Sequence, residues 1–362
     1  MGSTLDFVAE EIAEKATCSP EIEVSAKDME FISVIVPVYN EAKHIESVLD
    51  ELMAQEYPSE RIEILVIDGR STDKTRELVE NYARKYPNIH LLDNPKRLAS
   101  AGRNIGINAA KGNIILIVDG HCIIRNPQMV SNVNRAMQIP GVEGLGRPQP
   151  LLLENPSPVQ RAIATARESW LGHHPDSLIY SNKPQFVPAQ SVGVAYRREI
   201  FSKIGLFDET FDACEDCELN HRYDQAGLAC YFSPDIGINY VPRDSLSKLA
   251  KQMIRYGRGR VRLVKKHPET FSLKMFLPAF FLIGVIFGTG LSFFSSIAAT
   301  IFACVTLVYG LTVLVESFRL SFRKRFLYGL LLIPLTFVTI HLAAGAGLFW
   351  ESIRSLSRGK QE

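Results

Sequence analysis

Two aspartates near the ends of apolar runs could bind a phosphorylated ligand. Asp68 ends the run RIEILVID, and Asp119 ends the run NIILIVD. One such carboxylate can accept hydrogen bonds from a base or a ribose. Another can hold Mg²⁺ or Mn²⁺ on a diphosphate, because these cations prefer hard oxygen ligands and substrate phosphates. The pair therefore suits a ligand that combines a nucleoside with a diphosphate.

Two common nucleotide sites are not expected. The turn after the first apolar run reads PVYNEAKH and lacks the GxGxxG pattern of a dinucleotide fold. The chain also lacks the GxxxxGK pattern of a P-loop ATPase.

A cysteine grouping offers different chemistry. Cys214, Cys217 and His221 have a spacing compatible with zinc or redox chemistry. A structural zinc site needs a fourth ligand, and no second CxxC exists, so we favour small buried thiols on a helix. The six cysteines do not suggest a disulfide framework in a cytosolic domain.

Alternating strands and helices would position the two acids. Strands are expected at 31–38, 61–68, 88–92 and 113–119, and helices at 41–55, from 73 to about 85, and at 98–110. Tyr39-Asn40-Glu41 is a plausible cap for the first of these helices. Such alternation implies parallel βαβ units, whose ligands bind at the carboxyl ends of the strands. Asp68 and Asp119 should therefore meet at one crevice.

The last quarter of the chain has a different composition. There is no charged residue between Lys274 and Glu316, which is room for two membrane spans near 276–294 and 297–315 with a turn at Ser295-Ser296. A third uncharged run covers 326–350. Buried core helices are the alternative, but soluble cores rarely need such long uncharged runs. The net charge of +1, from 40 Lys+Arg and 39 Asp+Glu, does not favour a general nucleic-acid binder.

Basic residues predict the orientation in the membrane. Clusters at 255–274 and 319–325 flank the first two spans, and the positive-inside rule places both in the cytosol. The tail, with Arg354, Arg358 and Lys360, would then lie outside, which conflicts mildly with the same rule unless the third segment is re-entrant or interfacial. Residues 1–30 lack an apolar signal sequence, and a short helix is expected near 4–16.

Several segments resemble known motifs in the same order along the chain. They are VPVYNE, VIDGRSTDKT, IVDGHC, SVGVAYRREIFSKIGLFDE at 191–209, CEDCELNHR, and the Gln252 to Tyr256 stretch QMIRY. Over roughly residues 31–265 the chain resembles the family 2 glycosyltransferases, which have a fold called GT-A and mostly use UDP- or GDP-sugars. The DGH form and the hydrophobic C-terminal segments look most like bacterial exopolysaccharide enzymes of the succinoglycan glucosyltransferase type.

The resemblance implies a donor site and a metal site. The residues it assigns to the donor are Pro37, Tyr39, Glu41, Asp68, Arg103 and Asp119. Asp68 would bind the nucleobase, although Gly69 replaces the second acid that the family often has there, and capping of the next turn is the alternative role. Asp119 and His121 would hold Mn²⁺ or Mg²⁺, with His121 standing where a second acid is usual. An imidazole suits Mn²⁺ better than Mg²⁺.

The resemblance also implies catalytic and acceptor residues. Asp216 would be the general base that activates an acceptor hydroxyl, with Glu215 in support; a simple helix cap is the alternative for Asp216. Gln252, Arg255 and Tyr256 resemble the family's QxxRW, with Tyr256 in place of the tryptophan, and would contact the diphosphate or the acceptor sugar. The remaining basic residues at 258–266 would meet anionic headgroups.

The sequence thus predicts an α/β GT-A domain followed by a hydrophobic helical membrane region. The expected divisions are an extension at 1–30, the transferase domain at 31–242, a basic connector at 243–274, a region of about three spans at 275–350, and a tail at 351–362. The expected function is inverting sugar transfer from a nucleotide-sugar to a lipid-linked saccharide, by a multi-pass protein of the cell membrane with its catalytic domain in the cytosol. Partners would be the donor, the acceptor and membrane lipids, but no nucleic acid. The alternatives are a polyprenyl-phosphate sugar transferase, a processive synthase, and a non-catalytic scaffold.

Overall fold

A computed structural model describes residues 29–173 and 178–358. The helix predicted near 4–16 lies outside these residues. The chain divides into two compact units, Met1–Pro150 with Ser177–Val241, and Leu151–Asp176 with Pro242–Glu362. The segment 151–176 lies inside the predicted 31–242 domain but groups with the C-terminal part of the chain.

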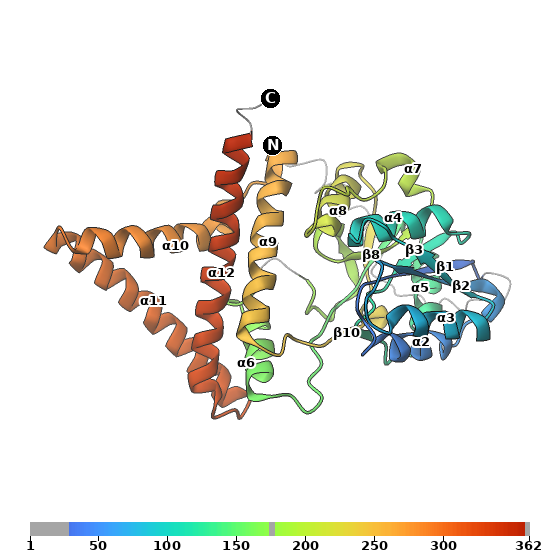
Figure 1. Ribbon diagram of the computed structural model, residues 1–362, viewed down its shortest axis with the longest axis horizontal. Coiled ribbons are helices and arrows are strands. Elements are labelled where there is room, and N and C mark those ends of the chain that lie inside the picture. The colour runs from blue at the N-terminus through green and yellow to red at the C-terminus, as the bar shows by residue number, and fades with distance from the viewer. Residues whose placement is uncertain (1–28, 174–177, 359–362) are drawn as a thin grey trace. The chain divides into compact units, whose positions relative to one another are not determined.

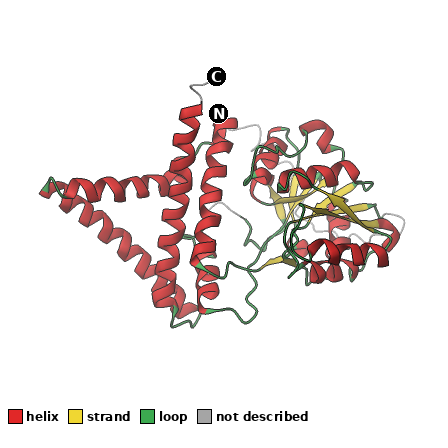
Figure 2. Cartoon of the chain, viewed as in Figure 1, coloured by secondary structure: helices red, strands yellow, loops and turns green. Residues whose placement is uncertain are grey.

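The first unit is an α/β fold (Figures 1 and 2). Its strands are β1 (Ile32–Val38), β2 (Ile62–Asp68), β3 (Ile89–Asp93), β4 (Ile114–Ile117), β5 (Cys122–Ile123), β6 (Gly144–Gly146), β7 (Gln185–Val187), β8 (Gly193–Arg197), β9 (Cys230–Phe232) and β10 (Asn239–Tyr240). Its helices are α2 (Ile45–Met53), α3 (Thr75–Lys85), α4 (Ala99–Ala109), α5 (Met129–Met137), α7 (Ile200–Ile204) and α8 (Glu215–Gln225). Short 3₁₀ turns are η2 (Ser59–Arg61), η3 (Ala189–Ser191) and η4 (Pro234–Ile236).

The described part of this unit contains one large mixed sheet, in the order β3-β2-β1-β4-β8-β6-β9-β7. Strands β3, β2, β1 and β4 pair in parallel, whereas β8 is antiparallel to both β4 and β6. A small second sheet pairs β10 with β5. The predicted α/β class and the four predicted strands are confirmed, each strand within two residues of its expected end.

Helices cover both faces of the sheet, which explains the near-continuous apolar composition of its central strands. On one face, Val34 and Val36 of β1 pack with apolar residues of α2, α3 and α5. On the other face, Ile35 packs with residues of α4, α7 and α8. Gly106 lets α4 lie close to β1, because a Cβ there would be 2.6 Å from Ile35 Cγ2. This close contact places the first turn of α4 near the carboxyl ends of β1 and β4.

The proposed cap at Tyr39-Asn40-Glu41 is wrong. Helix α2 begins at Ile45, after His44, and has no side-chain cap. Asn40 has a φ of 56° and its Oδ1 instead accepts a hydrogen bond from Thr72 N at 2.8 Å. The Asn40 side chain is therefore used to join two loops and does not cap the helix.

The second unit consists of helices. They are α6 (Pro158–Arg167), α9 (Leu246–Lys266), the turn η5 (Pro268–Thr270), α10 (Leu273–Ser292), α11 (Ser296–Arg323) and α12 (Gly329–Arg358). Among the described residues, three helical segments are long and apolar enough to span a membrane: Leu273–Ser292, Ser296–Arg323 and Gly329–Ser355. The predicted hydrophobic helices and the turn at Ser295 are confirmed, since Ser295 caps α11 by accepting a hydrogen bond from Ala298 N.

Candidate active site

Hydrogen bonds join the loops that follow β1 and β2. Besides the bond from Thr72 N to Asn40, Thr75 Oγ1 accepts from Glu41 N at 2.8 Å and Ser71 Oγ accepts from Asn40 N at 2.9 Å. These bonds hold the loop after β1, which contains the predicted sugar-donor-binding residues Tyr39 and Glu41, against the loop after β2.

The structure gives Pro37 and Tyr39 different surroundings. Pro37 is in β1. A Cβ at Gly102 of α4 would be 3.3 Å from Pro37 Cβ, so the backbone of α4 lies close to that of β1. Tyr39 is exposed just after the strand. A Cβ at Gly69 would be 3.2 Å from Val38 O and 3.4 Å from Tyr39 Cβ, so the small residue leaves room for the Tyr39 side chain.

Asp68 is fully buried at the end of β2. Its Oδ1 accepts a hydrogen bond from Ser71 N at 3.1 Å, and its Oδ2 pairs with Arg76 Nη1 at 3.3 Å. The carboxylate therefore caps the following turn, as the alternative interpretation predicted, and it is compensated by a cation from α3.

Asp119 lies just beyond β4 among polar partners. Its Oδ2 accepts a hydrogen bond from the Tyr240 hydroxyl at 2.8 Å, and its Oδ1 lies 3.5 Å from Arg103 Nη2. Burial alone would raise the pKa of Asp119, but Arg103, His121 and Tyr240 together lower it below its ordinary value. Burial and the neighbouring carboxylate raise the pKa of Tyr240, so its hydroxyl remains a hydrogen-bond donor. Asp119 is thus held as an anion near neutral pH.

His121 is oriented by two neighbours. Its Nδ1 lies 3.1 Å from Glu41 Oε1, and its ring meets the Tyr240 ring edge-on with centroids 6.1 Å apart. A carboxylate on one ring nitrogen is the usual way in which proteins orient a histidine that binds a metal through the other. Glu41, predicted as a donor residue, therefore contacts the predicted metal residue.

Arg103 joins the acid of β4 to the start of α8. Its Nη1 pairs with Glu215 Oε1 at 2.7 Å, and both side chains are nearly buried. Burial raises the pKa of Glu215, and Arg103 opposes that rise. Asp216 is the next residue; it is exposed, and its Oδ1 accepts a hydrogen bond from Cys217 N at 2.8 Å. Helix α8 starts after Cys214, which has a φ of 63°, so Asp216 lies in the first helical turn and is not its N-cap.

The first unit thus gathers Glu41, Arg103, Asp119, His121 and the Glu215-Asp216 pair. Sequence reasoning missed two of their neighbours, Tyr240 and Arg147. Arg147 is buried behind β4, where its Nη2 donates to Ile117 O at 2.9 Å and its charge helps to lower the pKa of Asp119. Neither residue stands in a recognisable motif, and Tyr240 comes from the distant strand β10, so no local pattern could have indicated them.

The predicted acceptor residues lie on α9 of the second unit. Gln252 Nε2 donates to the Tyr256 hydroxyl at 3.0 Å, and Tyr256 is exposed, as is Arg255. The expectation that all basic residues at 258–266 face headgroups is wrong for two of them. Arg258 and Arg262 pair through Nε with the two oxygens of buried Glu351, at 3.0 and 2.9 Å.

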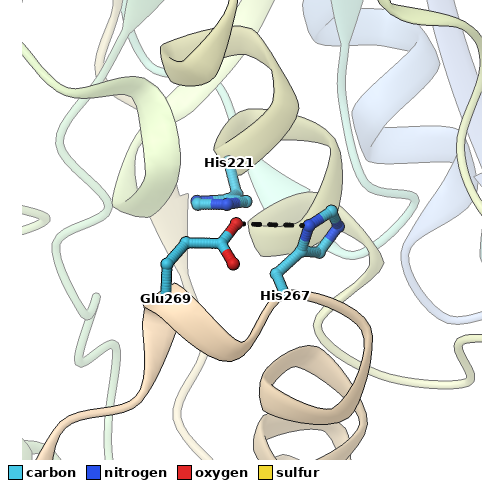
Figure 3. A group of neighbouring side chains, drawn as sticks. All are labelled: His221, His267 and Glu269. Atoms are coloured by element: carbon cyan, nitrogen blue, oxygen red, sulfur yellow. Dashed lines mark ion pairs between the residues drawn. The ribbon is translucent and has the colours of Figure 1, made fainter.

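The cysteine hypothesis gains no support from the described residues. Cys214 is buried and Cys217 is half-buried, and within the described ranges neither belongs to a group of three or more side chains that could hold a metal. Figure 3 shows His267 and Glu269 of the second unit, whose Nδ1 and Oε1 atoms lie 3.6 Å apart. His221, also drawn there, comes from α8 of the first unit. A histidine and a glutamate alone do not complete a metal site, so we assign none to this pair.

The chain matches the model of a known family over more than half of its length. The model of a family described as "Glycosyltransferase like family 2" matches residues 30–259. The chain belongs to this family. It is therefore an enzyme, a family 2 glycosyltransferase.

Relatives match this family 2 glycosyltransferase over nearly its whole length. A dolichyl N-acetyl-alpha-D-glucosaminyl phosphate 3-beta-D-2,3-diacetamido-2,3-dideoxy-beta-D-glucuronosyltransferase from Methanococcus voltae is 28% identical over 339 residues, 92% of this chain and 100% of that protein. Succinoglycan biosynthesis protein ExoA from Rhizobium meliloti is 28% identical over 330 residues, 90% of this chain and 96% of that protein. The predicted likeness to succinoglycan enzymes is confirmed.

A solved structure has the same fold. The mannosyltransferase PcManGT from Pyrobaculum calidifontis, in complex with GDP-Man and Mn²⁺, has a TM-score of 0.59 at 17% identity and covers 96% of this chain and 95% of its own. The GT-A fold predicted for this family 2 glycosyltransferase is therefore confirmed.

Proposed function

We propose that this enzyme transfers a sugar from a nucleotide-sugar, expected to be a UDP-sugar, to a hydroxyl of a lipid-linked saccharide, with inversion at the anomeric carbon. The observation that supports it most is the cluster in which Arg103 joins Asp119, on the donor side, to Glu215 beside Asp216. One cation thereby joins a donor-binding acid to the helix start that carries the candidate base.

On the donor side, the proposal gives Asp68 the nucleobase and Asp119 the ribose or the metal. The loops after β1 and β2 are hydrogen-bonded to each other, so Tyr39 and Glu41 would be presented to the donor as one preorganised wall. Preorganisation matters because a loop ordered before binding need not lose that freedom on binding. Arg103, a cation at this edge, would contact the donor phosphates.

Asp119 and His121 fit a divalent cation. Asp119 supplies an anionic oxygen, and the Glu41 carboxylate at Nδ1 orients the His121 imidazole as proteins usually orient a metal-binding histidine. A mixed oxygen and imidazole set suits Mn²⁺ better than Mg²⁺. Such a cation would offset the charge that develops on the leaving diphosphate.

Asp216 is the proposed general base. It would take the proton of the acceptor hydroxyl while the hydroxyl oxygen bonds to the anomeric carbon. The bond from that carbon to the phosphate oxygen breaks, and its electron pair leaves with the nucleoside diphosphate. The exposed position of Asp216 beside the buried Arg103–Glu215 pair supports this role, because Glu215 would then hold the helix start while Asp216 faces the substrate.

The acceptor is proposed from the membrane helices and the relatives. The names of two relatives refer to a dolichyl phosphate-linked sugar and to succinoglycan. Gln252, Arg255 and Tyr256 of α9 would contact the diphosphate or the acceptor sugar. We further propose that the catalytic domain lies in the cytosol at the cell membrane.

A donor panel tests the proposal. Purified enzyme is incubated with UDP- and GDP-sugars, native membrane lipid extract, and Mn²⁺ or Mg²⁺, and nucleotide release and the anomeric configuration of the product are measured. We expect release with one donor, dependent on the metal and the lipid, and an inverted product. A product with retained configuration, or a sugar attached directly to a phosphate, would contradict the proposal.

A further inference from the structure

The third apolar helix, α12, differs from the other two in its surroundings. In the most apolar windows of α10 and α11, 6% of residues are buried, whereas 39% are buried in that of α12. Figure 1 shows α9 alongside α12, while α10 and α11 extend away from α12 and meet at a tip. All these helices belong to the second unit. Only α12 is therefore covered by protein along one side.

Helix α6 covers the N-terminal half of α12. Ala162 and Ala166 of α6 pack in one cluster with Ile333 and Phe337 of α12. Arg161 donates to Lys324 O at 2.7 Å in the turn before α12.

The turn after α6 continues this contact. Leu171 O lies 2.9 Å from Nε2 of His341, near the middle of α12. Lys324 Nζ pairs with Glu168 at 3.0 Å. Helix α6 and the turn after it therefore cover α12 from its start to its centre.

Helix α9 covers the C-terminal half. Leu249 and Met253 share a cluster with Ile340 and Ala343. A Cβ at Gly347 would lie only 2.2 Å from Ile254 O, so the two backbones are in close contact.

Ion pairs join α9 to α12 near the C-terminal end of α12. Arg258 and Arg262 of α9 both bind Glu351 of α12. Helix α9 therefore follows α12 from its centre to its last turns.

These partners are incompatible with a hydrocarbon environment. Helix α9 contains eight Lys or Arg residues and no acidic residue, and α6 contains two arginines. If α12 crossed the bilayer, both helices would be drawn into its centre, where each arginine or lysine is strongly disfavoured. An amphipathic helix in the plane of the membrane instead keeps basic side chains at the headgroups and its apolar face in the acyl boundary.

The exposed side of α12 fits such a position. Leu331, Leu335, Phe349 and Ile353 are exposed, and at 100° per residue they fall within about 40° of one another around the helix. Helices α10 and α11 of the same unit also expose apolar side chains, such as Phe287 and Val308, so the lipid of the same membrane is the occupant that we assign to this stripe.

We infer that α12 lies along the membrane surface on the side of the catalytic unit and does not cross the bilayer. The chain then crosses with the α10–α11 hairpin alone, whose helix α10 of 20 residues is about 30 Å long. The C-terminal tail lies on the catalytic side, where Arg354, Arg358 and Lys360 satisfy the positive-inside rule that three spans would violate.

The side of the tail tests this inference, because only a crossing by α12 separates the tail from the catalytic unit. The full chain carries one cysteine appended after Glu362, or Glu80→Cys on α3 as the reference for the catalytic side. Sealed vesicles of each orientation are treated with a membrane-impermeant maleimide, and labelling above that of the unmodified chain is measured. We expect both cysteines to be labelled in the same vesicles. Labelling of the tail only in vesicles of the opposite orientation would overturn the inference.

A depth measurement provides a second, independent test. Nitroxides are placed at Leu342→Cys, mid-way along α12, and at Val305→Cys on α11 as the matched membrane position. We expect a water-soluble relaxation agent to reach position 342 several-fold more than position 305. Equal protection of the two positions would show that α12 is as deep as α11 and would refute the inference.

Discussion

Replacing Arg103 by methionine should sharply lower the activity of the enzyme. The side chains of Arg103 and Glu215 are 11% and 12% exposed and 2.7 Å apart. Removing one partner of a buried pair typically costs about 3–5 kcal/mol, and we take about 3 kcal/mol for this nearly buried one. If that cost falls on the transition state, kcat/KM decreases about 150-fold. The loss should be large because Arg103 also lies beside Asp119, so two acids lose their shared cation.

The assay is sugar transfer with varied donor and Mn²⁺. Lysine at position 103 should restore part of the activity, because it keeps the charge but loses the forked geometry. Lys203→Met is the matched control: it breaks an exposed pair with Glu143, where the expected effect is below about 1 kcal/mol.

A double-mutant cycle with Glu215→Gln isolates the pair. If the arginine acts by compensating this carboxylate, the double variant should be less impaired than the sum of the single effects predicts. A folded Arg103→Met enzyme with wild-type kcat/KM would refute the reasoning, and strict additivity would show that the ion pair has no role in transfer.

Other features of the structure lead to three further predictions. Tyr240→Phe removes a hydrogen bond to a charged group, worth about 1.5–3 kcal/mol, so about 10- to 150-fold more Mn²⁺ should be needed for donor binding, while Tyr231→Phe leaves the Mn²⁺ titration unchanged. Gly347→Ala places a Cβ against a carbonyl of α9 and should lower the melting temperature in detergent, whereas Gly284→Ala, with open space around it, should not; equal melting temperatures would disprove the close contact. Burial raises the pKa of Asp224 to about 6, above its unfolded value of about 3.9, so its contribution to stability is complete below the unfolded pKa and is lost as pH rises through 6. Thermal unfolding from pH 4 to 8 checks the sign, and a slope that Asp224→Asn leaves unchanged would contradict it.

The sequence was sufficient for the parts of the fold that rest on local patterns. Strands such as Ile62–Asp68 are largely apolar runs closed by an acid, and the run without charges after Lys274 is long enough for apolar helices. The acids at the ends of β2 and β4 were predictable because parallel strands end at one edge of the sheet.

What sequence reasoning missed depends on contacts between distant segments. Asn40 was assigned to a helix cap, yet it binds a loop 32 residues away. Tyr240 reaches the Asp119 region from β10, and Arg147 reaches it from the segment that follows β6. Arg258 and Arg262 resemble free headgroup-binding residues until Glu351, on the last helix, is seen to bind both. A one-dimensional pattern contains no information about such partners.

The most direct test of the central claim is to measure donor binding and sugar transfer together in Asp216→Asn. Asparagine has nearly the same shape as aspartate but cannot accept the proton of an acceptor hydroxyl. We predict that the variant binds the nucleotide-sugar with wild-type affinity in the presence of Mn²⁺ and that its transfer to the lipid acceptor falls by at least about 100-fold, the lower range for general base catalysis. Transfer at a near wild-type rate would contradict the account, because Asp216 could then not be the base.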